Sequence, residues 1–151
     1  MDPKPQIRIL SPGDASLLRS MLALFAQAFD DEDSYLARQP SDSYLNDLLA
    51  RDTFIAIAAM DDGGGVIGAL AGYVLPKFEQ QRSEFYIYDL AVDVAHRRRG
   101  IATAMIRKLR QHGAKLGIHV IYVQADVGDA PAIALYTKLG QREDVLHFDI
   151  D

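Results

Sequence analysis

The pattern of hydrophobic and polar positions predicts four helices. Apolar residues recur at intervals of three and four between Leu17 and Phe29, which is typical of an amphipathic helix. Residues 41–49 indicate a second, shorter helix, and residues 129–139 indicate another that ends at Gly140. A longer helix opens after Gly100, and its apolar side carries Ile101, Met105, Ile106, Leu109 and Leu116.

Six segments carry the pattern of β-strands. They are residues 6–10, 53–60, 66–75, 84–92, 119–124 and 145–150. The glycine-rich turn over residues 61–65 joins the second and third as a hairpin. Because a helix lies between the fourth and the fifth, we expect those two strands to run parallel. The order predicts a single domain over residues 1–151 with an α/β (α+β) fold, in which a mixed central β-sheet carries helices on both faces.

Composition narrows the class of protein. The chain has no cysteine, so it has no disulfide and no thiol nucleophile. The opening MDPKPQIRIL has no apolar segment of signal-peptide length, and the most apolar stretch, residues 66–75, is too short to cross a bilayer. We therefore expect a cytoplasmic protein. A net charge of −5 argues against a nucleic-acid-binding protein, which would show a basic face, and suits a cationic substrate.

The densest positive charge stands directly before the longer helix, in Arg97, Arg98 and Arg99. Helix N-termini have unpaired backbone N–H groups and partial positive charge, so they bind phosphate readily. Gly100 lets a ligand approach the backbone, Ala102 keeps the next turn narrow, and Thr103 offers a hydroxyl. This spacing predicts a pyrophosphate site, although a solvated basic loop is the alternative. It matches neither the P-loop nor the dinucleotide glycine pattern.

Two stretches resemble the signatures of the GCN5-related N-acetyltransferases. RRRGIA at residues 97–102 resembles the acyl-CoA pyrophosphate loop of that superfamily, and AIALYTKLG at residues 132–140 resembles its second signature. From Thr53 onward, YVLPKFEQQRSEFYIYDLAV, VIYVQAD and HFDID narrow the likeness to aminoglycoside 3-N-acetyltransferases of this type. Two positions depart from the superfamily pattern: Asp129 stands where asparagine is common, and Gln141 where an aromatic residue is usual.

The resemblance implies a fold, a co-substrate and a partner. The sheet would have about six to seven strands, the chain would use acetyl-CoA without a metal, and it would form a homodimer. The four histidines show no metal-ligand spacing of their own. The residues expected to contact the cofactor are Leu90, Ala91, Val92, Arg97, Arg98, Arg99, Gly100, Ile101, Ala102, Thr103, Asp129, Ala132, Tyr136 and Lys138.

Asp89 is the candidate general base. It is a carboxylate within a strand of apolar and aromatic residues, where burial is costly unless the group is paired or useful. Strict alternation would place it on one face with Phe85, Ile87 and Ala91. It could take the proton directly or through a water, or only hold the ammonium group. The alternative is a structural aspartate bonded to a neighbouring loop, and Glu84 is then the second candidate.

Tyr136 is the candidate general acid. A tyrosine at helical spacing is usually a core residue, but the resemblance puts the matching superfamily tyrosine near the CoA sulfur. There its phenol would protonate the leaving thiolate. Backbone N–H groups near residues 90–92 would stabilise the oxyanion if the strand is irregular there, as the family fold implies.

An acidic run follows the first helix, in Asp30, Asp31, Glu32 and Asp33. Anions at the C-terminal end of a helix oppose its dipole, so stability does not favour them there. The resemblance places this loop over the acceptor site, where it would attract the ammonium groups of an aminoglycoside. The alternative is a solvated loop. The other acids expected at the acceptor site are Glu84, Asp89, Asp126, Glu143 and Asp144.

These observations predict an enzyme that transfers an acetyl group from acetyl-CoA to the 3-amino group of the deoxystreptamine ring of aminoglycosides. Acetylation would remove the positive charge of this amino group, weaken binding of the drug to ribosomal RNA and give antibiotic resistance. Two alternatives stay open: an acetyltransferase for a polyamine or a peptide amine, and a CoA-binding regulatory module without catalysis.

Overall fold

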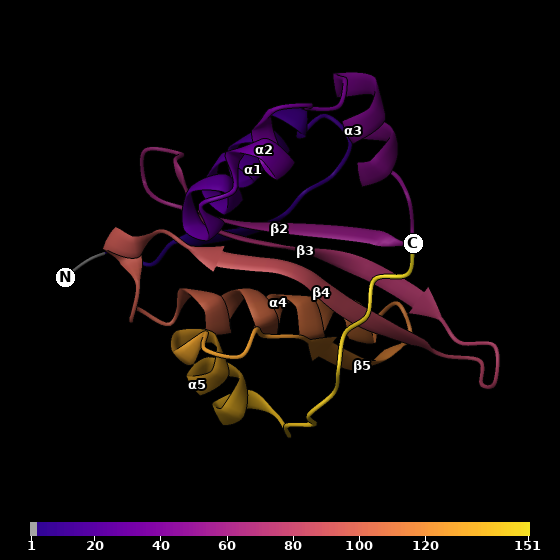
Figure 1. Cartoon of the computed structure of the whole chain (residues 1–151). Helices are drawn as coiled ribbons and strands as arrows, with labels where there is room; N and C mark the ends of the chain where they lie inside the picture. The colour runs from indigo at the N-terminus through magenta and orange to yellow at the C-terminus, as the bar shows by residue number, and fades with distance from the viewer. Residues whose placement is uncertain (1–2) are drawn as a thin grey trace.

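The computed structural model describes residues 3–151, and Figure 1 shows the arrangement of its helices and strands. The chain begins with β1 (Gln6–Ile9), α1 (Ala15–Phe29), α2 (Glu32–Leu36) and α3 (Asp42–Leu49). Helix α4 (Ile101–Ala114) comes after β4 and before β5. The remaining strands are β2 (Phe54–Met60), β3 (Val66–Pro76), β4 (Ser83–Val92) and β5 (Ile118–Val123). The last helix is α5 (Ala130–Leu139), and a 3-10 turn, Val94–His96, lies between β4 and α4.

The five strands form one mixed sheet in the order β1-β2-β3-β4-β5. From β1 to β4 each strand is antiparallel to the next, and short connections join β2 to β3 and β3 to β4. The α4 crossover makes β5 parallel to β4, as the sequence predicts. The predicted fold class, a mixed sheet with helices, is therefore confirmed.

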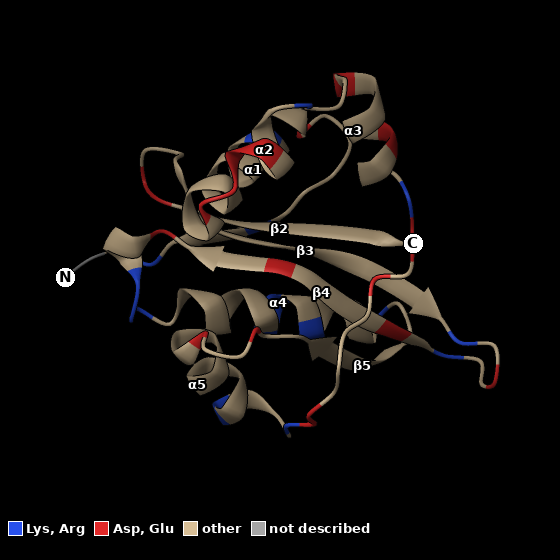
Figure 2. Cartoon of the chain, in the orientation of Figure 1, with Lys and Arg blue, Asp and Glu red and all other residues tan. Residues whose placement is uncertain are grey.

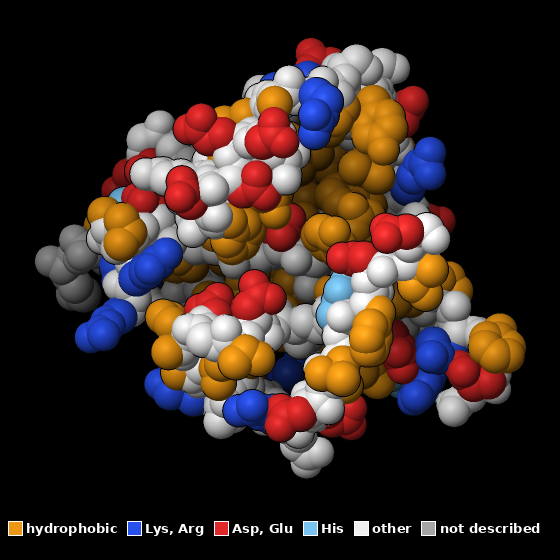
Figure 3. All heavy atoms as spheres, in the orientation of Figure 1, with side chains coloured by type: hydrophobic (Ala, Val, Ile, Leu, Met, Phe, Trp, Pro, Cys, Tyr) orange, Lys and Arg blue, Asp and Glu red, His pale blue; other side chains and the backbone are white. Residues whose placement is uncertain are grey.

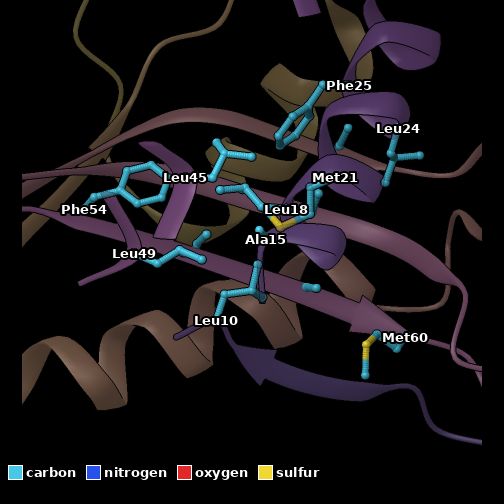
Figure 4. Close-up of a cluster of buried hydrophobic side chains, with 14 residues drawn as sticks. Leu10, Ala15, Leu18, Met21, Leu24, Phe25, Leu45, Leu49, Phe54 and Met60 are labelled. Atoms are coloured by element: carbon cyan, nitrogen blue, oxygen red, sulfur yellow. The ribbon is translucent and has the colours of Figure 1, made fainter. Parts of the chain in front are cut away.

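Two hydrophobic cores lie on opposite faces of the sheet. On one face, α1 and α3 pack over β2 with Met21, Phe25 and Leu45, and Figure 4 shows this cluster. On the other face, α4 packs with Met105 and Leu109 against Phe85 and its neighbours. Every residue of β2 is buried, because alternate side chains enter the two cores.

Three expectations about the elements are wrong. The sheet has five strands, because residues 145–150 have no secondary structure and pair with no strand of residues 3–151. An alternating pattern alone does not make a strand, which needs a hydrogen-bonded neighbour. Part of the acidic run forms α2, although it was expected to be a loop. Helix α4 ends at Ala114, before Leu116, and the chain then turns at Gly117 with φ +75°.

No helix within the described part of the chain is both long and apolar enough to cross a membrane. The same residues hold no group of three or more His, Asp or Glu side chains that could bind a metal ion.

Candidate active site

A β-bulge interrupts β4 at Tyr88. Asp89 pairs with Ala71 of β3, but the next partner, Gly72, pairs with Ile87, so Tyr88 is the extra residue. A Cβ at Gly72 would overlap the Tyr86 carbonyl oxygen and lie 2.6 Å from the Phe85 ring, so the strands meet this closely only at a glycine.

The bulge reverses which face each side chain of β4 takes. Phe85 and Ile87 point into the core under α4, whereas Ala91 belongs to the core under α1. Asp89 lies on the α1 face with Ala91, where it meets Tyr35. The expectation that Asp89 shares a face with Phe85 and Ile87 is therefore wrong, because an extra residue breaks the period of two.

Asp89 accepts a hydrogen bond from the Tyr35 hydroxyl, with 2.9 Å between the Tyr35 Oη and Asp89 Oδ1 atoms. Burial raises the pKa of Asp89, and the Tyr35 hydrogen bond acts in the opposite direction without cancelling it. Burial, followed by the Asp89 interaction, holds the pKa of Tyr35 far above its usual value, so Tyr35 stays a donor. A carboxylate with a raised pKa is a better proton acceptor than an ordinary one.

Tyr35 was not identified from the sequence. It lies in α2, within a stretch that was expected to be a loop, and is 54 residues from Asp89 along the chain. No local pattern signals such a contact, although Tyr35, two residues after the acidic run, is of a type that donates to buried carboxylates.

Aromatic side chains continue from Asp89 along the same face as a tyrosine strip, formed by Tyr73, Tyr88, Tyr86 and Tyr122. Tyr88 packs edge-on against Tyr73 and Tyr86, with ring centroids 5.8 Å and 5.9 Å apart, and Tyr86 stacks on Tyr122 at 4.9 Å. Tyr73 and Tyr88 are exposed. The strip is thus an accessible aromatic surface beside Asp89, suited to pack against an apolar face of a ligand.

The sheet splits next to Asp89. Pairing between β4 and β5 ends at Ile87 with Val123, and β4 continues through Val92 with β3 as its partner. In Figure 1 the two strands run together at their first residues and diverge toward their ends. Over residues 88–92, the edge of β4 that would face β5 therefore pairs with no strand of residues 3–151. Its backbone groups can bind a ligand's amide groups or an oxyanion.

The arginine loop follows the 3-10 turn after β4, and Arg97, Arg98 and Arg99 are exposed. Arg98 and Gly100 both have left-handed backbones, with φ +63° and +75°. Gly100 is the N-cap of α4 and brings no capping side chain, and a Cβ built on it would meet no atom within 4 Å. The start of α4 thus has no side-chain cap, open space at Gly100 and three arginines beside it, as a pyrophosphate site requires. Arg97 also donates to the Val92 carbonyl at 3.2 Å, which ties the loop to β4.

Helix α5 carries the second set of expected cofactor residues. Asp129 is its N-cap and accepts a hydrogen bond from the Ala132 N–H at 3.3 Å, so these two residues have a structural role at the helix start. Burial, with a smaller contribution from Asp129, raises the pKa of Tyr136 to about 12. Tyr136 therefore keeps its proton at neutral pH, as a general acid must. Lys138 is exposed in the last turn.

The expected acceptor acids are not all in one place. Asp31 caps α2 by accepting from the Ser34 N–H, and hydrogen bonding to the Ser34 side chain, followed by that to its backbone, lowers the pKa of Asp31. Glu32 and Asp33 lie in the first turn of that helix, where the dipole favours them. The expectation that these residues oppose a helix dipole and destabilise the protein is therefore wrong.

The other expected acids lie elsewhere. Glu84 lies five residues before Asp89 and its Oε1 is 3.7 Å from the Lys77 Nζ atom. Asp126, Glu143 and Asp144 are exposed, and Asp144 pairs with Arg142 at 2.6 Å.

The space-filling view shows a hollow on this side of the molecule, below α1–α3, with hydrophobic side chains in its depth and acidic side chains around it (Figure 3). Figure 2 shows the acidic connection between α1 and α2 above β4, and the basic loop before α4 at one end of the sheet. One region is thus suited to a cation and the other to an anion.

The chain belongs to the acetyltransferase (GNAT) family, which matches residues 18–141. A curated relative from Mus musculus, "Probable N-acetyltransferase family 8 member 5", is 29% identical over 80 residues, which make up 53% of this chain and 35% of that protein. The chain thus spans about a third of the length of this relative.

Solved structures of aminoglycoside acetyltransferases are similar along the whole chain. HMB0005, from an uncultured soil metagenomic sample, is 53% identical over 99% of both chains, with a TM-score of 0.96. The enzyme meta-AAC0020 from such a sample, in complex with sisomicin, is 30% identical over 97% of this chain and 95% of its own, with a TM-score of 0.86.

Proposed function

We propose that this protein acetylates aminoglycosides, with acetyl-CoA as the donor and the 3-amino group of the deoxystreptamine ring as the acceptor. The observation that carries the proposal is the half-buried Asp89 carboxylate at the bulge, beside the tyrosine strip and beneath the acidic run. Two features of the similar proteins support the substrate class: HMB0005 is an aminoglycoside acetyltransferase and meta-AAC0020 binds sisomicin. The 3-position rests on the resemblance of the strand and tail sequences.

The arginine loop fits the pyrophosphate of CoA. The open space at Gly100, the uncapped start of α4 and the three exposed arginines support an anion site there, and Arg97 and Arg99 also donate to the carbonyls of Val92 and Pro3. Acetyl-CoA would supply the acetyl group as an activated thioester. The backbone edge of residues 88–92 would hold the pantetheine amides and donate hydrogen bonds to the carbonyl oxygen.

The side chains can move the two protons that the transfer requires. Asp89 Oδ takes one from the substrate ammonium, which frees the nitrogen lone pair to form the new C–N bond. The raised pKa of Asp89 favours this step. Tyr136 Oη would give a proton to the sulfur as the C–S bond breaks, and its own high pKa keeps that proton available until then. The second proton that the nitrogen loses as the amide forms would restore the Tyr136 phenol through solvent.

A thiol-release assay with acetyl-CoA tests the proposal against gentamicin, sisomicin, neamine, spermidine and a peptide amine. We expect turnover on the aminoglycosides, and NMR of the product should show acetylation at the 3-amino group. Turnover on the polyamine or the peptide alone would contradict the substrate class, and acetylation at another amine would contradict the position.

Replacement of the base is the matching test of mechanism. Asp89→Asn should lower turnover about 100-fold or more, the usual scale for loss of a general base. Acetyl-CoA affinity should stay unchanged, because the anion site lies beyond the end of β4. Asp47→Asn, at an exposed aspartate of α3, is the control. Turnover of Asp89→Asn within a few-fold of the unmodified protein would contradict the role of Asp89.

A further inference from the structure

The tyrosine strip crosses the sheet on the face that carries Asp89. Three neighbouring strands supply it: β3 carries Tyr73, β4 carries Tyr86 and Tyr88, and β5 carries Tyr122. Since neighbouring strands lie about 4.8 Å apart, the strip extends roughly 10 Å across the sheet. Tyr88 directly precedes Asp89 in the chain, so the strip adjoins the candidate base.

The helices leave this part of the sheet open. Among the described residues, the core under α1 and α3 includes none from β5. Tyr88, Tyr73 and Tyr122 are 61%, 41% and 38% exposed. A continuous row of large exposed rings is unusual on a protein surface and marks a place where a ligand binds.

The rings are held in fixed orientations before any ligand arrives. Tyr88 stands edge-on between Tyr73 and Tyr86, with interplanar angles of 85° and 73°. Tyr86 stacks on Tyr122 with an interplanar angle of 10°, and its hydroxyl donates to Gln124 Oε1 at 2.8 Å. Rings that are already fixed lose little conformational entropy when a ligand covers them, so the strip is preorganised for binding.

The strip and the acids beside it suit a ligand that combines an apolar ring face with positive charge. An aromatic ring packs against the C–H groups on the face of a sugar ring and also attracts an ammonium group to its negative face. Asp89 and the acidic run, residues 30–33, add negative charge nearby, and Figure 2 shows that run above β4. A sugar ring that carries amino groups meets both requirements.

We propose that the tyrosine strip binds the amino-sugar ring that an aminoglycoside carries at O4 of its deoxystreptamine, and that this ring thereby determines which acceptors bind well. The inference rests on the proposed function, which places the 3-amino group at Asp89. The carbons that bear the 3-amino group and O4 are neighbours, so the O4-linked ring then lies next to Tyr88. The carbon that bears O6 lies opposite in the deoxystreptamine ring, so the O6-linked sugar is farther from the strip.

Calorimetric titration with three acceptors tests the strip without requiring turnover. Neamine contains deoxystreptamine with the O4-linked ring, garamine contains deoxystreptamine with the O6-linked ring, and 2-deoxystreptamine has neither. Tyr88→Leu should raise the Kd of neamine about 10-fold, because one stacked ring and one exposed cation–π contact together contribute about that factor. The Kd values of garamine and 2-deoxystreptamine should stay unchanged.

Two variants serve as controls. Tyr88→Phe keeps the ring and should bind neamine as the unmodified protein does. Phe78→Leu makes the matched change at a residue that is 99% exposed in the connection between β3 and β4, and it should leave all three Kd values unchanged. The proposal is overturned if neamine does not bind, if its Kd is the same in Tyr88→Leu, or if garamine or 2-deoxystreptamine is weakened as much as neamine.

The role of the strip and the proposed function fail in different ways. Turnover on neamine together with a Kd that does not respond to Tyr88→Leu would overturn the role of the strip and leave the proposed function standing. Neamine binding that responds to Tyr88→Leu, without turnover on any aminoglycoside, would overturn the proposed function and leave the strip as an amino-sugar site.

Discussion

At the residue scale, burial and the hydrogen bond from Tyr35 act in opposite directions on the pKa of Asp89. Tyr35 donates to the charged form of the carboxylate and therefore opposes the upward pKa shift that burial causes. Tyr73 of β3 and Tyr86 of β4 also lie near Asp89, and burial raises the pKa of both, so they stay neutral at physiological pH. Tyr35 is thus the group that holds the Asp89 carboxylate by a direct hydrogen bond.

Tyr35→Phe should raise the pKa of Asp89, because it removes the hydrogen bond that favours the ionised carboxylate. Asp89 accepts protons when it is ionised, so the acidic limb of the kcat/KM profile should move to higher pH. Activity should fall most at low pH and recover toward alkaline pH. Kinetics across the pH range check this, with Tyr44→Phe, at an exposed tyrosine of α3, as the control. An equal loss at every pH would show that Tyr35 serves only the packing.

At the element scale, the bulge in β4 depends on Gly72. Since a Cβ there overlaps the Tyr86 carbonyl and crowds the Phe85 ring, Gly72→Ala should force the strands apart. We expect the free energy of unfolding to fall by about 3 kcal/mol, which corresponds to roughly 6–12 °C in Tm for a chain of this size. Thermal unfolding measures it. Gly140→Ala, where a Cβ would meet nothing within 4 Å, should be nearly neutral, and equal losses in the two variants would contradict the account.

Two substitutions of Gly100, in the turn before α4, distinguish backbone strain from electrostatic repulsion of the ligand. Its φ of +75° means that any side chain there costs about 1–2 kcal/mol of stability. Gly100→Ala and Gly100→Glu should therefore lose similar stability. Gly100→Glu alone brings a negative charge to the pyrophosphate, which should weaken CoA binding about 100-fold or more relative to Gly100→Ala. Calorimetric titration with CoA decides this, and equal affinities would place the pyrophosphate elsewhere.

At the scale of the whole molecule, acidic and basic surfaces are separated although the net charge is −5. The acidic run lies over β4 and the arginines lie at its end, so a cationic acceptor and an anionic donor can approach different regions (Figure 2). Changing Asp30, Asp31, Glu32 and Asp33 to their amides should raise KM for gentamicin and leave KM for acetyl-CoA unchanged.

Shape should survive this replacement, since asparagine also caps helices and tolerates the left-handed backbone of Asp30, whose φ is +51°. Screening lengths fall from about 10 Å at 0.1 M salt to about 3 Å at 1 M, so the difference in KM should shrink as salt rises. Steady-state kinetics at two ionic strengths measure it. An unchanged KM at low salt would mean that the run only starts α2.

The sequence determined those features that depend on neighbouring residues. Repeats of three and four placed α1 and α4, alternating residues placed the β2–β3 hairpin, and the spacing of Arg97 to Ala102 placed the arginines at a helix start. It also identified Asp89, because a carboxylate in an apolar strand is conspicuous whatever its neighbours are. These signals are local, and so is the backbone geometry that produces them.

Only the tertiary structure decided what Asp89 faces and what it touches. The bulge at Tyr88 arises from how β4 pairs with β3, and the Tyr35 contact joins segments 54 residues apart, so neither leaves a mark on the local pattern. Residues 145–150 show the converse case. Their alternation is that of a strand, yet a strand exists only where another backbone accepts its hydrogen bonds, and the described chain offers them none.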